Sequence, residues 1–294
     1  MILHRCGALL TPRQTSKEFA MKVRFLSLLA LIVALAVVPL AHAATITLDA
    51  SKDASIFQNN VNNSSGAANG LIVGTNAQSS TRRAAIAFDV ASALPAGAVI
   101  QNVQLNLVLG GVAGGGGGGG GPANVTIGLH RLAANWGEGI AQQQSPPTDG
   151  LGGQGQGVAA GAGDITWNSS FHGSSLWATP GGDVTAMASA SALIDALVGG
   201  TKSWSSTAEL VSDVQNWFDN PSSNFGWMLV TTDEATANTG RTFFSSEVAT
   251  AAFRPQLEIT YEVIPEPSTL LLGVTAGLVS LVVPSRLARR ELRG

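Results

Sequence analysis

The sequence predicts an all-β fold: an antiparallel, jelly-roll-like β-sandwich with one short helix, flanked by an N-terminal signal helix and a C-terminal transmembrane helix. Three observations predict this class. Many short stretches alternate apolar with polar residues, which is typical of strands with one buried face. Segments rich in glycine and asparagine separate these stretches. The body of the chain contains one convincing helical pattern, so strands dominate the prediction.

Residues 1–43 are predicted to be a Sec-type signal peptide. The basic segment Met21–Arg24 precedes the apolar run Phe25–Leu40, and Ala41-His42-Ala43 forms a small-x-small cleavage site. We expect signal peptidase to cut before Ala44. Residues 1–20 form a prefix of mixed composition before the basic segment. The simplest explanation is that translation starts at Met21. The rival interpretation is that residues 1–20 are a genuine extension of the signal peptide's N-terminal region.

Residues 44–263 form the predicted β-domain. Strands are expected at 44–48, 71–74, 83–90, 103–109, 124–132, 164–167, 226–232, 241–245 and 256–263. The clearest half-buried strand turns Val103, Leu105, Leu107 and Leu109 to one face. Residues 226–232 are apolar on both faces, which predicts a central, fully buried strand.

Two long glycine-rich loops are predicted, near residues 110–122 and 142–163. The uninterrupted run Gly114–Gly121 lacks the Lys-Ser/Thr pair of a phosphate-binding loop, and no helical pattern follows it. We interpret this run as an expanded, flexible hairpin connection between the strands on either side.

The helix is predicted at Thr207–Phe218. Its apolar residues recur with helical spacing and form one stripe: Leu210, Val211, Val214, Trp217 and Phe218. Ser206 and Glu209 have the spacing of a capping box, and Asn220-Pro221 ends the pattern.

The predicted domain is acidic. It carries sixteen acidic and seven basic side chains, a formal charge of about −9, whereas the whole chain carries −3. We therefore expect no nucleic-acid binding, because such binding needs clustered basic side chains that displace the counterions of the nucleic acid. The single cysteine, Cys6, precedes the signal peptide, so the domain is expected to fold without a disulfide.

A few residues are candidates for sugar binding. Trp136, Trp167 and Trp177 lie in loop-rich sequence, where exposed indoles could stack on pyranose rings, and Glu138 lies beside Trp136. The alternative is ordinary loop anchoring, in which a carboxylate accepts backbone N–H bonds next to a buried indole.

Four aspartates are candidate ligands of a structural Ca²⁺, which prefers oxygen donors: Asp53, Asp89, Asp164 and Asp183. No other cofactor is expected. No catalytic residue is predicted, because the sequence has no nucleophile elbow and no metal-protease motif. A carboxylate pair for glycoside hydrolysis stays open, since such a pair need not be local in sequence.

Several stretches occur in the order found in one family of exported β-modules. They are Arg82-Arg83, Phe88-Asp89, Leu94–Ala98, His130–Leu132, Trp136–Gly139, Gly163–Trp167, Trp177–Asp183, Val211–Trp217, Asn224–Trp227, Ser246-Glu247 and Arg254–Leu257. In these stretches the domain resembles the DNRLRE family, which is related to carbohydrate-binding modules. The resemblance implies a β-sandwich and, for some relatives, contact with acidic polysaccharide. Asn135 and Ser246 depart from the family pattern, which has Asp and Arg at those places.

The C-terminal segment 264–294 reads as a sorting signal. Pro265-Glu266-Pro267 ends the fold, residues 269–283 are apolar, and the basic tail 286–293 carries the arginines that stop translocation: Arg286, Arg289, Arg290 and Arg293. In this order the segment resembles the PEP-CTERM signal of Gram-negative bacteria. The resemblance implies transient anchoring in the inner membrane and cutting by an exosortase-type enzyme, followed by release to the cell surface or extracellular matrix.

The sequence therefore predicts an exported, non-enzymatic module associated with exopolysaccharide, for example in a biofilm matrix. The alternatives are an extracellular polysaccharide hydrolase or lyase, and a structural matrix protein without a ligand. A cleft with converging carboxylates would favour the enzyme, exposed indoles would favour sugar binding, and burial of every indole would favour the structural protein.

Overall fold

The computed structural model describes residues 21, 43–113, 121–142, 151 and 154–263. The chain divides into two units, and His42–Val263 is the compact unit treated below. The predicted signal peptide apart from Met21 and Ala43, residues 114–120 of the glycine run, residues 143–150 and 152–153 of the second predicted loop, and the tail 264–294 lie outside the described residues. No helix among the described residues is long and apolar enough to cross a membrane.

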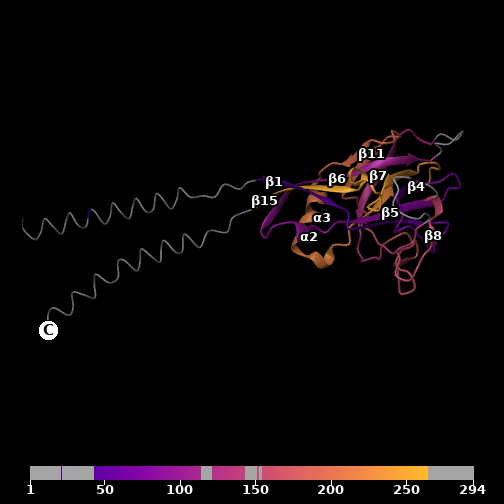
Figure 1. Ribbon diagram of the computed structural model, residues 1–294, viewed down its shortest axis with the longest axis horizontal. Coiled ribbons are helices and arrows are strands. Elements are labelled where there is room, and N and C mark those ends of the chain that lie inside the picture. The colour runs from indigo at the N-terminus through magenta and orange to yellow at the C-terminus, as the bar shows by residue number, and fades with distance from the viewer. Residues whose placement is uncertain (1–20, 22–42, 114–120, 143–150, 152–153, 264–294) are drawn as a thin grey trace, which may run out of the picture. The chain divides into compact units, whose positions relative to one another are not determined.

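The regular secondary structure of the described residues is mostly antiparallel β-sheet (Figure 1). The main strands are β1 (Ala43–Asp49), β2 (Lys52–Phe57), β4 (Gly70–Thr75), β5 (Thr81–Ala87), β6 (Ala98–Val112), β7 (Val125–Arg131), β11 (Ala190–Ile194), β12 (Thr201–Trp204), β13 (Trp227–Thr231), β14 (Arg241–Phe244) and β15 (Gln256–Val263). Short strands are β3 (Asn63–Ser64), β8 (Val158–Ala159), β9 (Ser169–Phe171) and β10 (Ser175–Leu176). The helices are α2 (Val90–Ala93) and α3 (Ala208–Asp219), with single 3₁₀ turns at Gln154–Gln156, Pro221–Ser223 and Ala251–Phe253.

One long strand joins the two parts of the sheet. The main order is β1-β15-β6-β14-β4-β5-β13-β7-β11, with β12 paired to β6 and β2 paired to β5. Ala98–Asn106 of β6 pair with β15, and its last residues, Leu109–Val112, pair with β14. The sheet therefore curls over, and its two parts enclose a common core in a sandwich-like arrangement.

The core confirms the expected alternation. Val103, Leu105, Leu107 and Leu109 of β6 are all fully buried, and they pack in one cluster with side chains from the opposite part of the sheet, from β4, β5, β7 and β13. As predicted for residues 226–232, every residue of β13 is buried. Burial of this apolar surface is the main favourable term in a domain without a disulfide.

Helix α3 confirms the predicted helix but corrects its cap. The capping residue is Thr207, whose side chain accepts a hydrogen bond from the Leu210 N–H. Ser206 instead accepts one from Val103 N–H and so ties the segment before the helix to β6. The buried stripe of α3 is Leu210, Val214 and Trp217, together with Asp213.

Three other expectations were wrong. The strand expected at 83–90 ends at Ala87, because Asp89 caps the short helix α2 that begins at Val90. Residues 164–167 form a loop rather than a strand. The glycine run does not close a hairpin: β7 pairs with β13 and β11, whereas β6 pairs with β15, β14 and β12.

Candidate metal centre

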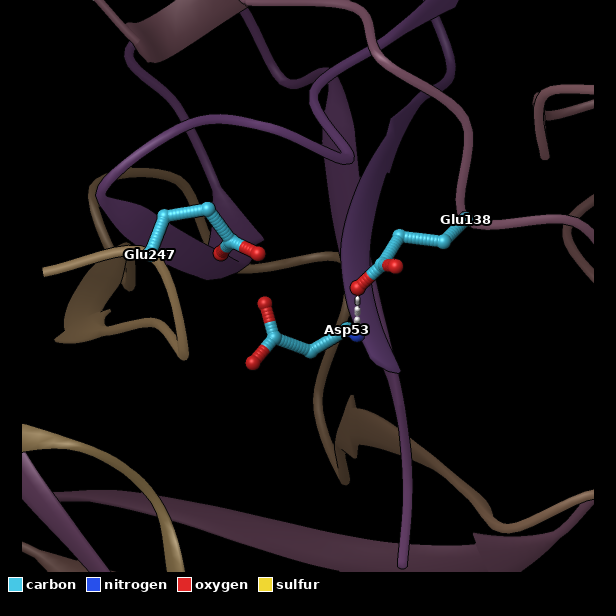
Figure 2. Close-up of side chains that lie close together, drawn as sticks. All are labelled: Asp53, Glu138 and Glu247. Carbon is cyan, nitrogen blue, oxygen red and sulfur yellow. Dashed lines mark hydrogen bonds between the residues drawn. The ribbon is translucent and has the colours of Figure 1, made fainter. Parts of the chain in front are cut away.

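Three carboxylates from separate parts of the chain converge in the structure: Asp53, Glu138 and Glu247, here called the carboxylate cluster (Figure 2). Each offers an oxygen atom that lies within 4.8 Å of the corresponding atoms of the other two. Figure 2 shows the three side chains pointing toward one common space. Among the described residues, this is the group of metal-ligating side chains that comes close enough to share an ion.

Strand β2 positions Asp53. Its backbone pairs with Ile86 of β5, and all of β2 after Lys52 is buried. The Asp53 carboxylate is therefore held inside the protein. The side chain is only 1% exposed. A carboxylate held this deeply needs donors or a cation to offset its lost hydration.

The loop after β7 positions Glu138. Trp136 anchors this loop: its indole is buried and its Nε1–H donates to the Phe225 carbonyl oxygen at 2.8 Å. Lys52 lies 4.2 Å from the centre of the Trp136 ring and donates to the Trp136 carbonyl oxygen. Gly139 follows with a φ of +78°, and a Cβ there would lie 1.9 Å from Oδ1 of Asp164, so only glycine fits this turn.

The turn after β14 positions Glu247. Ser245 lies at its start, where its hydroxyl donates to the Ala68 carbonyl oxygen and accepts from the Glu247 N–H. The Ser246 N–H donates to Oδ2 of Asp53 at 2.8 Å, and the Ser246 hydroxyl bonds to Oε1 of Glu247 at 2.9 Å. This short Ser-Ser-Glu segment thus holds two members of the cluster against each other.

The donors around the cluster reach only some of its oxygens. Oε1 of Glu138 accepts from the Asp53 N–H at 2.7 Å, and Ser246 serves one oxygen of each of the other two carboxylates. Oδ1 of Asp53 and Oε2 of Glu247 are buried and accept no hydrogen bond from the described residues. Buried polar atoms without a partner are uncommon in native proteins and call for an explanation.

Burial and repulsion between neighbouring acids raise the pKa values of two members of the cluster, Asp53 and Glu138. Burial raises the pKa of Asp53 well above its usual range, and the neighbouring charge of Glu247 raises it further. Burial likewise raises the pKa of Glu138 to about 7. Burial lowers the pKa of Lys52 to about 8, although the charge of Glu138 opposes this shift. Without a cation, the cluster must therefore retain protons at a pH where isolated acids have lost them.

The structure unites part of the predicted metal set. Asp53 lies in the cluster with Glu138, which was expected to bind sugar, and with Glu247, which was not a predicted ligand. Its only sequence signal was the Ser246-Glu247 match in the family resemblance. The three other aspartates bind backbone or hydroxyl donors elsewhere: Asp89 caps α2, Asp164 accepts from Gly161, and Asp183 accepts from Ala178 and Thr179.

The predicted sugar platform is contradicted by burial. Trp136 is 1%, Trp167 7% and Trp177 5% exposed, and the other three tryptophans are fully buried. The Nε1–H of Trp177 donates to the Thr166 carbonyl oxygen, and Arg83 covers the Trp167 ring at 5.3 Å. These indoles pack the loops against the sheet, which is the anchoring alternative, and none presents a face to a pyranose ring.

No protein-family model matches the chain, and a search of curated proteins finds no match either.

Proposed function

We propose that this protein is an exported, non-enzymatic module of the cell surface or exopolysaccharide matrix in a Gram-negative bacterium, with the jelly-roll-like β-sandwich of the DNRLRE family. In this proposal signal peptidase removes residues 1–43, and the PEP-CTERM-like tail 264–294 anchors the chain in the inner membrane until an exosortase-type enzyme cuts it. The curled antiparallel sheet and its single long helix, α3, agree with this fold.

The pairing of the first and last strands is the observation that carries the proposal. Strand β1 pairs with β15 over its whole length, and Ala44 lies opposite Tyr261. The expected start of the mature protein and the end of the folded domain therefore lie at the same end of the sheet. The sorting motif begins directly after β15 ends at Val263, and the cut before Ala44 removes only the first residue of β1, so both processing steps would take place at the border of the fold.

Mass spectrometry of the protein recovered from the cell surface tests this delivery. The proposal predicts an N-terminus at Ala44 and a C-terminus near Pro265–Pro267. Surface protein that still ends in Arg293-Gly294 would contradict it, and so would retention of the apolar run Phe25–Leu40.

Two observations argue against a polysaccharide hydrolase. The carboxylate cluster is centred on Asp53, which is almost completely buried, and a carboxylate without solvent exposure is poorly placed to contact a glycosidic bond. A cavity of about 310 Å³ lies elsewhere, and the residues that line it include no carboxylate. Release of reducing or unsaturated sugar ends from any polysaccharide by the purified domain would overturn the non-enzymatic assignment.

Because all six indoles are buried, we propose that polysaccharide contact through this domain uses chiefly polar groups. The cavity offers such groups: Asn76, Arg82, Gln156 and Thr242. Affinity electrophoresis of the domain, residues 44–263, in gels with neutral or acidic polysaccharide tests this part. Retarded migration supports association with polysaccharide. Unchanged migration in every gel contradicts it and leaves the structural matrix protein as the function.

A further inference from the structure

The carboxylate cluster has the dimensions of a Ca²⁺ site. Its three nearest oxygen atoms lie within 4.8 Å of one another. Oxygens that share one Ca²⁺ bind it at about 2.3–2.6 Å, so two ligands on the same ion are at most about 5 Å apart. One ion can therefore reach all three side chains with little movement of the elements that carry them.

A second observation points independently to a missing positive partner. Asp53 is 1% exposed, yet its Oδ1 accepts no hydrogen bond from the described residues, and neither does the buried Oε2 of Glu247. The local donors, the backbone and hydroxyl of Ser246, are already used by the other oxygens of these two residues. Two buried, donor-free oxygens that belong to converging carboxylates are what a bound cation would satisfy.

We propose that Asp53, Glu138 and Glu247 bind one Ca²⁺ ion. The donor set is all oxygen, which suits a hard cation and disfavours zinc or copper, whose sites are built mainly from histidine nitrogen and cysteine sulfur. Mg²⁺ fits less well because it demands near-ideal octahedral geometry and keeps several of its waters. Ca²⁺ accepts carboxylates in one- or two-oxygen contact, and it completes about six to eight ligands with water.

The bound ion would join three segments that the backbone leaves far apart: the start of β2, the loop after β7 and the turn after β14. Asp53 is separated by 85 residues from Glu138 and by 193 from Ser246, the neighbour of Glu247. The ion then serves as a cross-link in a domain without disulfides, and it replaces mutual repulsion of the acids by attraction to a common charge. This inference does not depend on export or on polysaccharide contact.

Thermal unfolding of the domain, residues 44–263, is the test, since His42–Val263 forms a compact unit with its own core. After removal of metal by a chelating resin, about 20 mM Ca²⁺ should raise the melting temperature by about 5–10 °C, as expected for a ligand at about 20 times its Kd or more on a domain of this size. The same concentration of Mg²⁺ should give a clearly smaller rise. Equal melting temperatures with Ca²⁺ and with chelator would overturn the proposal.

Two variants and a matched control locate the ion. Asp53→Asn and Glu247→Gln keep the shape of each side chain and remove its charge, so each should reduce the Ca²⁺-dependent rise to less than about 1 °C. The control Asp183→Asn changes an acid that accepts two backbone N–H groups outside the cluster, and it should keep the full rise. A full rise in both cluster variants, or its loss in the control, would contradict the assignment.

A purely structural role for Asp53 predicts a different result in chelator. If Asp53 only accepts the hydrogen bond from Ser246, then Asp53→Asn replaces a charged acceptor by a weaker, neutral amide oxygen and should lower the melting temperature of the metal-free domain. If Asp53 is an ion ligand, the same substitution removes repulsion between acids, so the metal-free variant should melt at least as high as the metal-free wild type. Glu247→Gln should give the same sign, which keeps the test valid if one variant fails to fold.

Discussion

Two buried aspartates of this domain, Asp213 and Asp53, show opposite ways of placing a carboxylate in a protein interior. Asp213 of α3 accepts hydrogen bonds from the Ser189 hydroxyl at 2.5 Å and from Trp227 Nε1–H at 2.9 Å, and it forms an ion pair with Arg131 at 3.5 Å. Asp53 has one donor, Ser246, and its other close neighbours are the acids Glu138 and Glu247.

The difference lies in what surrounds each acid rather than in how deeply it is buried. Asp213 is 8% and Asp53 1% exposed, so both have lost most of their hydration. Hydrogen-bond donors and the Arg131 cation offset the lost hydration of Asp213, which therefore stabilises the contact between α3, β7 and β13. The acidic neighbours of Asp53 add repulsion, so its lost hydration has to be offset by protons or by an ion from the solvent.

The largest expected effect is the loss of unfolding free energy when Asp213 is replaced by alanine. Asp213→Ala leaves the Ser189 hydroxyl and the Trp227 indole without their acceptor and removes the partner of Arg131, so it should lower the free energy of unfolding by about 2–4 kcal/mol. The loss should be the same with Ca²⁺ and with chelator, as measured by urea denaturation. Asp219→Ala, on the same helix, should cost less than about 1 kcal/mol because its acid accepts only an exposed bond from Gln215. If the loss of unfolding free energy in Asp213→Ala depended on Ca²⁺, the contrast between Asp213 and Asp53 would be wrong.

The next effect is a pH dependence that is specific to the metal-free cluster. The pKa of Glu138 is raised to about 7 and that of Asp53 is raised well above its usual range, both chiefly by burial. An acid with a raised pKa in the folded state contributes stability that is present below its unfolded pKa and is lost as pH rises through its folded pKa. In chelator, the melting temperature should therefore fall steadily as pH rises from about 5 to 8.

Ca²⁺ should flatten this dependence, since the bound ion stabilises the ionised acids. Melting curves at several pH values, with and without Ca²⁺, provide the measurement. A metal-free domain that becomes more stable as pH rises over this range would show that the cluster is not a group of mutually repelling acids.

A smaller effect concerns Lys52, the cation nearest to the cluster in sequence. Its ammonium group lies over Trp136 and interacts with Glu138, and burial lowers its pKa to about 8. Near pH 7 it is charged and opposes a second cation, so Lys52→Met should strengthen Ca²⁺ binding by about two- to fivefold. Calorimetric titration measures this change. Weaker binding in the variant would mean that Lys52 holds the loop of Glu138 in place and that this role outweighs its charge.

The smallest effect is expected at Asp89, an exposed acid that caps a single helical turn. Asp89→Ala removes the bonds to the Ser92 N–H and hydroxyl and should cost about 0.5–1 kcal/mol. The Ca²⁺-dependent rise in melting temperature should stay unchanged. A smaller Ca²⁺-dependent rise in the variant would indicate that Asp89 contributes to ion binding, as the sequence predicted.

The sequence was informative where burial alone decides the structure. The alternation at 103–109, the two apolar faces of 226–232 and the stripe of α3 all follow from local spacing, and each is confirmed. Strands β2, β11 and β12 were not predicted, because polar residues such as Asp53 and Lys202 interrupt their patterns while pairing with neighbouring strands holds them in the sheet.

The candidate site was only partly predictable because it is assembled by tertiary contacts. Asp53 was a candidate for its chemistry, but nothing local distinguishes it from Asp89, Asp164 or Asp183. The selection depends on which acids meet others and which meet donors, and the pairing of β2 with β5 and the turn after β14 determine this. The same limit explains the tryptophans: their loop context suggested exposure, whereas the folded loops bury them against the sheet.

The most direct test of the contrast between Asp53 and Asp213 is calorimetric titration of the metal-free domain with CaCl₂. We expect saturable binding of one ion per chain with a Kd at or below about 1 mM, the range of extracellular Ca²⁺ modules, retained in Asp219→Ala and lost in Asp53→Asn. Absence of saturable binding to the wild-type domain, or unchanged binding in Asp53→Asn, would contradict the assignment of the carboxylate cluster as a Ca²⁺ site.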